Sequence, residues 1–436
     1  MVKLTLGIDS STQGVKAVVW DAVAEKVVFS AAVNYGRDLP QYGSPDGFLP
    51  NADVLVRHAD PRMWVEGLEL VFAKLRASGC PMGDIAAIGG DAQQHASVYL
   101  ESLEPLVFSR STSPIWMDSS TSAECAALDA RFGSRLQADT GSPAIERFAG
   151  PQIMKFAKAD PEAYAKTRRI HLLSSFLASY LVGEDMPIDT GDGAGMNLLN
   201  LKTGDWDDEI CEFTAPGLRE KLPKVAARGG RAPYHRPLAA RFARFGLRPG
   251  IPVVPFTGDN PASLVGCFAE KPGTAVISLG TSDVFFAAMD SFHTDPDGCG
   301  HVFGNPMGGF MSLSCFKNGS LARDRVRREE VIPGQRSRLG NRLIRAVEEL
   351  HVVGVAAKGT DGSRVAATEG PGEDRPISTS LVATVNRREQ RSILGGSRER
   401  AIVSHIPVDG ARSTEGRKTR SRNKTEQKFL HFTYLL

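Results

Sequence analysis

Residues 326–436 of this 436-residue chain contain no Trp and no Cys, and their first aromatic residue is Phe429. The same stretch has 21 Lys and Arg against 13 Asp and Glu, a net charge of +8, whereas residues 1–325 have 31 against 37, a net charge of −6. Aromatic side chains supply much of the area that a folded core buries. A segment without them, rich in Arg, Gly, Ser and Thr, is predicted to be a basic, disordered tail.

The chain also lacks any apolar run of about 18 residues, so the sequence predicts no membrane-spanning helix. Residues 1–9 enter a strand pattern directly, which predicts no signal peptide and a cytoplasmic protein. The cysteines are scattered, without CxxC or metal-ligand spacing, and are expected to be reduced thiols of a cytosolic fold. They are Cys80, Cys125, Cys211, Cys267, Cys299 and Cys315.

The first 325 residues alternate between strand and helix patterns, which predicts an α/β fold. Short apolar runs predict a three-stranded meander, and the helical period that follows it begins with a proline suited to a first helical turn. The expected strands are 3–9, 15–20, 26–33, 85–89, 98–100, 251–256 and a hairpin of 275–279 with 284–288; the expected helices are 61–78, 119–132, 172–182 and one starting at Ala262.

Two turns of small polar residues, 9–16 and 278–283, each follow a strand. Successive backbone N–H groups in such turns form anion-binding nests. Asp9 at the first strand end is suited to hold Mg²⁺ through water, and hydroxyls with Lys16 suit phosphate oxygens. Each turn alone is more typical of an ordinary hairpin with a capping Asp, but one in each half favours phosphate binding. The candidate phosphate ligands are Ser11, Thr12, Gln13, Lys16, Gly280, Thr281 and Ser282.

Asp259 lies where a predicted strand meets a predicted helix, the position at which α/β proteins bind ligands. Phosphoryl transfer to an alcohol needs an acceptor for the hydroxyl proton, and a carboxylate in this place suits that role. A helix-capping Asp is the alternative. Asp189 and Asp192, in a Gly-rich turn, are interpreted as structural turn residues.

Several segments resemble the FGGY family of carbohydrate kinases, and xylulokinases in particular, over about residues 3–327. They occur in the family's order and include DSSTQGVKAVVWD (9–21), GGDAQQHASVY (89–99), PIWMDSSTSAEC (114–125), IERFAGPQIMKF (145–156), FTGDNPASLVG (256–266) and VISLGTSD (276–283). The resemblance implies actin-like, ribonuclease H-like ATPase domains, with the turns at 10–14 and 280–282 gripping the phosphates of ATP.

The same resemblance implies an enzyme that transfers the γ-phosphoryl group of ATP to D-xylulose, giving D-xylulose 5-phosphate, with Asp259 as catalytic base. It implies that His95, Arg147, Asp259 and Asn260 contact the sugar and that Mg²⁺ lies near Asp9. Neither a nucleic acid nor a membrane is expected as a partner, and the oligomeric state stays open. The alternatives are an FGGY kinase for another ketose or polyol, and a non-catalytic sugar-binding remnant.

The family's Gly-Gly motif that packs against adenosine is not found, because Gly395-Gly396 has no apolar strand before it. The expected organisation is an FGGY N-terminal domain at 1–250, an incomplete second domain of the same type at 251–325, and the unrelated tail at 326–436. For the tail, a gene-model artefact is favoured over a nucleic-acid-binding segment or a diverged kinase lobe. The sequence therefore predicts weak ATP binding and strands at 251–256 and 275–288 without covering elements.

Overall fold

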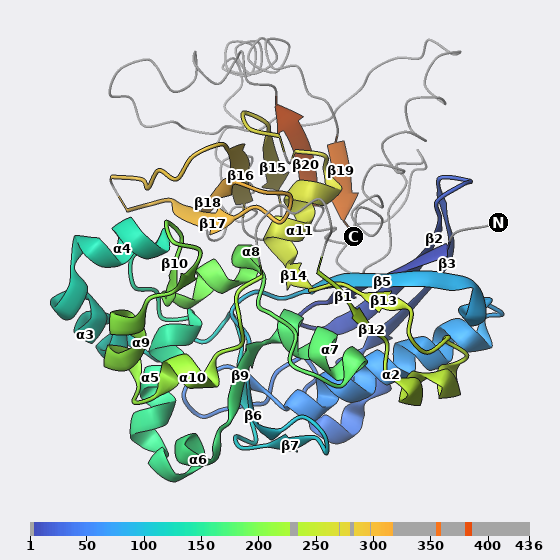
Figure 1. Cartoon of the computed structure of the whole chain (residues 1–436), viewed down its shortest axis with the longest axis horizontal. Helices are drawn as coiled ribbons and strands as arrows, with labels where there is room; N and C mark the ends of the chain where they lie inside the picture. The colour runs from blue at the N-terminus through green and yellow to red at the C-terminus, as the bar shows by residue number, and fades with distance from the viewer. Residues whose placement is uncertain are drawn as a thin grey trace, which may run out of the picture. The chain divides into compact units, whose positions relative to one another are not determined.

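The computed structural model describes residues 4–226, 234–269, 271–279, 283–296 and 298–316, and the backbone of two strands at 355–358 and 380–385 (Figure 1). These residues belong to two compact units. The first contains 4–266 and returns at 291–311; the second contains 267–290 and the described residues from 312 onward. The sequence pattern of residues 342–350 predicts one more helix, which lies outside the described residues, as do the Gly-Gly pair at 395–396 and the turn residues Gly280, Thr281 and Ser282.

The first unit is built on a mixed sheet that begins with the predicted meander. Strands β1 (Leu4–Ser10), β2 (Gly14–Asp21) and β3 (Lys26–Asn34) pair antiparallel in sequence order, and β5 (Ile85–Ala92) runs parallel to β1. The other edge is formed by β13 (Pro252–Val253), which is parallel to β5, and β12 (Arg236–Pro237). The α/β prediction is confirmed.

The segment 251–256 is covered, so the expectation that it would be an exposed strand is wrong. Its side chains Ile251, Val253, Val254 and Phe256 are buried in the first unit. The regular pairing of β13 is short, and β14 (Thr257–Gly258) resumes beside β5. Pro255 interrupts the run, because proline has no N–H to donate to the ladder.

A two-residue alternation separates the core face of this sheet from its polar face. In β1, Leu4, Leu6 and Ile8 are buried in the hydrophobic core, whereas Thr5 and Asp9 point to the other side and are less buried. In β2 the core-facing residues are Val15, Ala17 and Val19. This alternation places Asp9 of β1 and Lys16 of β2 together on the other face, away from the core.

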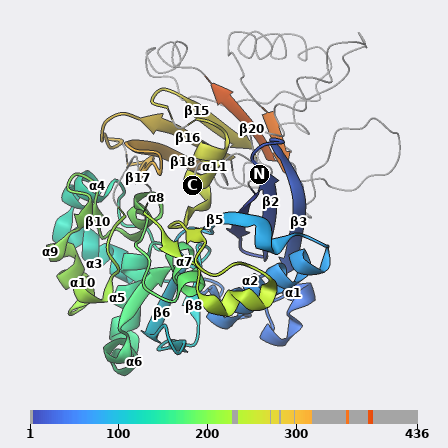
Figure 2. The same ribbon diagram turned by 45° about the vertical axis from the view of Figure 1, so that its right-hand side comes forward.

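Two helices contribute buried side chains to the hydrophobic core of this sheet, and Figure 2 labels both, α2 and α7. Helix α2 (Pro61–Ala77) begins after Asp60, whose side chain accepts a hydrogen bond from the N–H of Arg62, and it packs on β2 and β3 with Trp64 and Phe72 fully buried. Helix α7 (Leu173–Val182) packs on β5, β13 and β14. Both helices were predicted from their sequence period.

The rest of the first unit consists of short elements inserted between these. They are α1 (Tyr35–Asp38), β4 (His58–Ala59), β6 (Ser97–Ser102), β7 (Val107–Phe108), β8 (Ser113–Pro114), α3 (Ser122–Phe132), α4 (Ser134–Thr140), α5 (Ala149–Ala159), α6 (Pro161–Lys166), β9 (Arg169–Leu172), α8 (Thr190–Gly193), β10 (Leu199–Asn200), β11 (Asp205–Trp206), α9 (Asp208–Thr214), α10 (Leu218–Lys221), α11 (Asp259–Gly266) and β17 (His301–Gly304).

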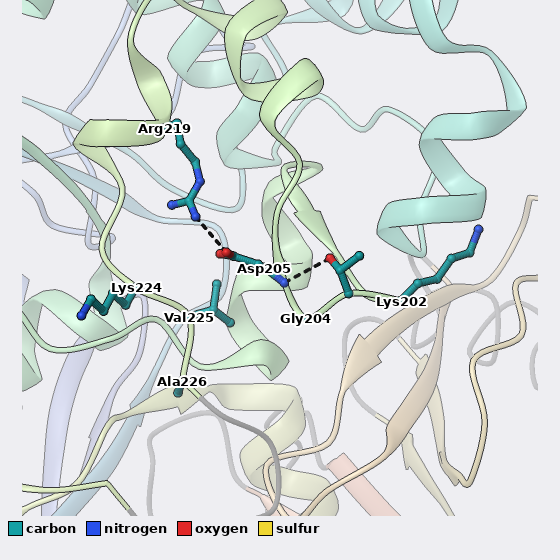
Figure 3. A pocket seen from close by; sticks show the side chains of 8 residues that line it. Lys202, Gly204, Asp205, Arg219, Lys224, Val225 and Ala226 are labelled. Atoms are coloured by element: carbon teal, nitrogen blue, oxygen red, sulfur yellow. Dashed lines mark hydrogen bonds and ion pairs between the residues drawn. The ribbon is translucent and has the colours of Figure 1, made fainter.

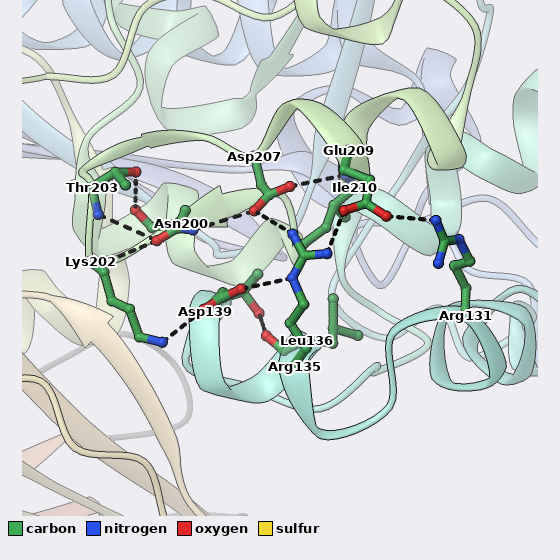
Figure 4. A network of polar contacts seen from close by, with 11 residues as sticks. Arg131, Arg135, Leu136, Asp139, Asn200, Lys202, Thr203, Asp207, Glu209 and Ile210 are labelled. Atoms are coloured by element: carbon green, nitrogen blue, oxygen red, sulfur yellow. Dashed lines mark hydrogen bonds and ion pairs between the residues drawn. The ribbon is translucent and has the colours of Figure 1, made fainter.

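A polar network joins α4, α9 and the β10–β11 turn at the surface of this unit (Figure 4). Arg135 contacts Asp139, Asp207 and Glu209, and Lys202 donates to Asp139 over 2.8 Å. The Arg135 side chain is 45% exposed. Each exposed pair therefore contributes about 0–1 kcal/mol, and the network orients these elements more than it stabilises them.

In the second unit, β15 (Ala275–Leu279) and β16 (Asp283–Met289) form the predicted hairpin. Its sheet continues from β16 to β18 (Phe310–Phe316) and from β15 to β20 (Ser380–Val385) and β19 (Val355–Lys358). β20 therefore covers one edge of the hairpin, which was expected to be bare. Of the stretch 326–436, only β19 and β20 are described.

All six cysteines are free, and Cys80, Cys125 and Cys211 are buried. Burial raises the pKa of the Cys211 thiol to about 12, which keeps it protonated. None of the helices in the described ranges combines the length and the apolar character that a membrane-spanning helix needs.

Candidate active site

The polar face of the sheet carries a row of charged residues around Asp9. The register pairs Asp9 with Lys16 of β2 and with Asp91 of β5, and it pairs Asp91 with Thr257 of β14. Paired residues on neighbouring strands point to the same face. Two carboxylates and one ammonium group are therefore next to one another at the ends of β1 and β5.

This row offers oxygen atoms of the kind that Mg²⁺ prefers. Within the described ranges, no group of three or more His, Cys, Asp or Glu could hold a metal ion by itself. A divalent cation at Asp9 would therefore depend on ligand or water oxygens for the rest of its coordination shell. Such sharing with a phosphate is typical of Mg²⁺ sites.

The first predicted phosphate turn follows directly on β1. Ser11 closes it, because both its N–H and its hydroxyl donate to the carbonyl of Gly14. The hydroxyl of Thr12 donates to Gln93 over 3.4 Å and accepts from the indole N–H of Trp116 over 2.8 Å. The turn is thus tied to two segments that are distant in the sequence.

Gly47 permits another segment to approach this turn closely. A Cβ at this position would lie 1.9 Å from the carbonyl oxygen of Thr12, and the backbone has a φ of +86°. Only glycine satisfies both conditions without strain.

His95 lies between an aromatic ring and a backbone turn in the first unit. It is 6% exposed, its backbone has a φ of +68°, and its ring stacks on Phe148 with a centroid distance of 4.5 Å. Its Nδ1 is 3.1 Å from the carbonyl of Gly195. Because a carbonyl can only accept, Nδ1 carries the proton and Nε2 is the acceptor nitrogen.

Burial holds the pKa of His95 well below its usual value, and the positive charge of Arg147 lowers it further. The imidazole is therefore neutral at pH 7. Arg147 is half-buried, and its guanidinium carbon is 5.9 Å from the centroid of the Phe148 ring. These two predicted sugar contacts thus both lie against the ring of the same aromatic residue.

A second neutral histidine, His301, completes this cluster. It belongs to β17, and its ring centroid is 5.8 Å from that of Phe148. Its Nδ1 lies 3.1 Å from the hydroxyl of Ser142. Burial, and then the charge of Arg147, lower the pKa of His301 to about 4.

Asp259 and Asn260 form the first turn of α11, where a negative charge is favoured by the helix dipole. The amide of Asn260 donates to the carboxylate of Asp259 over 3.2 Å and to the side-chain oxygen of Gln94 over 2.8 Å. The amide of Gln94 in turn lies 3.4 Å from the carbonyl of Gly191. A chain of side-chain amides therefore fixes the Asp259 carboxylate.

Asp189 and Asp192 lie in the turn that this chain reaches. Asp189 is the N-cap residue of α8: its side chain accepts from the N–H of Gly191, and it also accepts from the hydroxyl of Thr257 over 2.5 Å. These contacts are those of a structural turn residue, as the sequence predicted for Asp189. Asp192 is fully buried in the same helix and accepts a hydrogen bond from Ser174.

The predicted site residues thus come together in two groups within the first unit. Gln94 contacts Asn260, and the next residue, His95, lies against the Phe148 ring, as Arg147 does. The four predicted sugar residues therefore form one connected set. The second group is the Asp9 row with its turn. Four residues that lie beside the predicted site residues were not predicted from the sequence. They are Asp91, Gln94, Phe148 and His301.

Two of these four residues could have been predicted from the sequence. Asp91 and Gln94 lie in the segment 89–99 quoted above, and the two-residue period of a strand places Asp91 on the polar face. His301 had no such signal, because only the return of residues 291–311 to the first unit brings it near Phe148.

A separate open groove of about 640 Å³ lies in the first unit (Figure 3). Figure 3 shows the side chains of Lys202 and Lys224 pointing away from each other, while Arg219 is paired with Asp205 over 2.9 Å. None of the residues that line this groove belongs to the predicted site.

The sequence of the first unit matches known proteins. The N-terminal domain of the FGGY family of carbohydrate kinases matches residues 4–266. Xylulose kinase of Rattus norvegicus is 42% identical over 349 residues, which cover 74% of this chain and 63% of the relative. Xylulose kinase 2 of Arabidopsis thaliana is 39% identical over 350 residues, covering 74% and 61%. The chain thus spans less than two thirds of the length of these relatives.

Solved structures are similar as well. A crystal structure named as a xyloylose kinase from Brucella ovis has a TM-score of 0.65 and 26% identity, covering 87% of this chain and 72% of that one. Ligand-bound xylulose kinase from Lactobacillus acidophilus has a TM-score of 0.63 and 20% identity, covering 75% and 62%. These neighbours have the actin-like, ribonuclease H-like ATPase fold that the sequence predicted. The chain therefore belongs to the FGGY family of carbohydrate kinases.

Proposed function

We propose that this protein is a sugar kinase that transfers the γ-phosphoryl group of ATP to D-xylulose and yields D-xylulose 5-phosphate. The observation that carries the proposal is the fixed carboxylate of Asp259, held through Asn260 and Gln94 in an FGGY domain. The names of the relatives, xylulose kinases at 39–42% identity, support the choice of sugar.

The sugar would lie between the His95 cluster and the start of α11. Neutral His95 accepts a hydrogen bond from a sugar hydroxyl through Nε2, and Arg147 donates to a sugar oxygen. Because both amide N–H groups of Asn260 are already donated, to Gln94 and to Asp259, its side-chain oxygen accepts from a sugar hydroxyl. A site built on hydroxyl contacts discriminates against analogues that lack them, because its polar groups would then be unpaired.

Asp259 acts as the general base in this proposal. As the sugar oxygen attacks the γ-phosphorus, the O–H bond breaks and its proton moves to the Asp259 carboxylate. A new O–P bond forms while the bond from the γ-phosphorus to the leaving ADP oxygen breaks.

ATP with a divalent metal ion is the phosphoryl donor used by sugar kinases of this family, and we assign Mg²⁺ as the ion. Asp9 would hold it, with Asp91 beside it, and the ion would neutralise phosphate charge. Phosphate contacts are assigned to Ser11, Thr12, Gln13 and Lys16 in the first turn, and to residues 280–282 in the second, which stay a prediction.

We further propose a cytoplasmic protein whose partners are the sugar and ATP. The domain organisation that we propose keeps the order expected from the sequence, with the first boundary near residue 266, where the family match and the continuous part of the first unit end, and the second near residue 325. Binding of the sugar without turnover is the second candidate function. Two facts favour it. The match covers only 63% of the xylulose kinase of Rattus norvegicus, and the sequence contains no recognisable adenosine-binding Gly-Gly motif.

The test is ADP production by the purified chain with D-xylulose, with other ketoses and with glycerol, alongside calorimetric titration of sugar and of ATP. Turnover with kcat/KM for D-xylulose well above that for glycerol is expected. Equal kcat/KM values would indicate another FGGY kinase. Sugar binding without ADP production would support the second candidate function, which is binding of the sugar without turnover.

A further inference from the structure

Asp192 is a buried acid that the mechanism above does not use. Asp192 belongs to α8 and is 0% exposed. One of its carboxyl oxygens accepts a hydrogen bond from the hydroxyl of Ser174 in α7, and Ser174 is also 0% exposed. The other oxygen, Oδ1, is buried and has no hydrogen-bond partner in the described part of the chain. An ionised carboxylate with an unsatisfied buried oxygen would be costly.

The charges that act on Asp192 make ionisation harder still. They are the carboxylates of Asp189, on the same turn, and Asp259, at the start of α11; Ser174 is the polar group that faces it from α7. Burial, opposed in part by the Ser174 hydrogen bond, raises the pKa of Asp192 to about 8, and the two carboxylates contribute to this rise.

Asp192 is also mechanically connected to the start of α11. The turn that contains it packs on Pro261, because a Cβ on Gly191 would lie 2.9 Å from the Cβ of Pro261. The carbonyl of Gly191 is the end of the amide chain that runs through Gln94 and Asn260 to Asp259. A shift of the Asp192 turn would therefore reach the Asp259 carboxylate.

We propose that Asp192 is a positioning residue that is an uncharged carboxylic acid at neutral pH, docking the α8 turn on Ser174 and thereby holding Asp259 in place. In this state the acid fixes the turn without adding a negative charge beside Asp259. This inference rests on the proposed function only for the role of Asp259.

Ionisation of Asp192 would add a further negative charge to the carboxylates of Asp189 and Asp259, near which the negatively charged phosphates must approach. It would also strain the buried turn. Activity should therefore fall as the pH rises through about 8, and the effect should be on kcat more than on KM, because Asp192 does not touch the sugar.

The sign of the stability effect follows from the raised pKa. Between the unfolded pKa of about 3.9 and the folded pKa of about 8, the native state keeps a proton that the unfolded state has lost. The folding equilibrium constant of the wild type should thus fall by about tenfold per pH unit in this window relative to a variant without the acid, and the difference should level off above it.

The experiment compares Asp192→Asn, a neutral isostere, with Asp192→Ala and with the exposed control Asp129→Asn, all in the full chain. Urea unfolding is followed at pH 5–9.5 by fluorescence, since the chain's tryptophans, Trp20, Trp64, Trp116 and Trp206, all lie in the first unit. We expect Asp192→Asn to gain stability relative to the wild type as the pH rises to about 8, and Asp129→Asn to follow the wild type.

The kinetic measurement is the pH profile of kcat and of KM for D-xylulose in the same variants. Asp192→Asn should retain wild-type kcat at pH 7 and lose the decline above pH 8, whereas Asp192→Ala should lower kcat at least tenfold. Parallel pH dependence of stability in wild type and Asp192→Asn would overturn the proposal, as would a large loss of kcat in Asp192→Asn at pH 7. If the chain has no kinase activity, the stability profile still tests the protonation state.

Discussion

The indole N–H of Trp116 donates a 2.8 Å hydrogen bond to the hydroxyl of Thr12, across 104 residues of sequence. Trp116 is 43% exposed, whereas Trp20, Trp64 and Trp206 are buried. The most exposed indole of the chain is therefore attached to the turn that we assign to the phosphates of ATP.

Ligand binding at the Thr12 turn should change the fluorescence of Trp116. We expect titration with ATP and a divalent cation to alter the emission of the wild type, and Trp116→Phe to lose that change. The lost hydrogen bond is partly exposed, so the variant should lose only about 1 kcal/mol of stability. An unaltered signal in Trp116→Phe would mean that a buried tryptophan reports the binding.

Asp259→Asn should lower kcat by about 10²–10⁴-fold, because an amide cannot accept the hydroxyl proton. The fold should be unaffected, since the amide keeps the size of the side chain. Initial rates and thermal melts of this variant, with Asp129→Asn as the matched exposed control, test the role. Wild-type turnover in Asp259→Asn would remove this residue from the chemistry.

Gly195→Ala should displace the imidazole of His95. A Cβ at this position would lie 2.6 Å from Nδ1 and Cε1 of that ring, which is closer than van der Waals contact allows. We expect sugar affinity to fall at least tenfold in a calorimetric titration. Gly83→Ala is the control, because the nearest atom to its Cβ, the carbonyl oxygen of Gly246, is 3.7 Å away. Equal affinities of the two variants would contradict a role of His95 in sugar binding.

His301 should make the first unit sensitive to acid. Its pKa is about 4 in the folded protein, against about 6.5 when unfolded, so between these values the unfolded state binds the additional proton. Stability should fall by up to about 1.4 kcal/mol per pH unit from pH 6.5 to pH 4 through this residue. His301→Gln should reduce that dependence in urea melts, and the exposed control His293→Gln should not; identical slopes would show that another group is responsible.

Local patterns predicted the elements that depend on local sequence. The meander β1–β3 and helix α2 follow directly from two-residue and 3.6-residue periods, and the turn after β1 follows from its small residues. The segment 251–256 was misjudged because its pairing with β5 spans about 165 residues, which no local pattern reveals. The apolar run correctly predicted a strand, but the strand belongs to the sheet of the first unit and not to that of the second.

In the candidate site too, local sequence predicts some residues, whereas others depend on long-range packing. Asp259, Asn260 and His95 could be named because they lie in recognisable segments. The protonation of Asp192 could not, because it arises from burial and from charges contributed by α8 and α11 together. The lowered pKa of His301 likewise arises first from burial and then from the charge of Arg147, and both depend on the packing of β17 in the first unit.

The alternation in β1 also limits which length changes the gene can accept. Deleting one residue between Leu4 and Ile8 would turn the Asp9 carboxylate into the hydrophobic core, because side chains of a strand alternate between its faces. Only deletions or insertions of an even number of residues would keep the side chains of β1 on their faces. The turn between β2 and β3 has no such parity rule, since Val23 is 70% exposed at its tip, and insertions of any number should be tolerated in it.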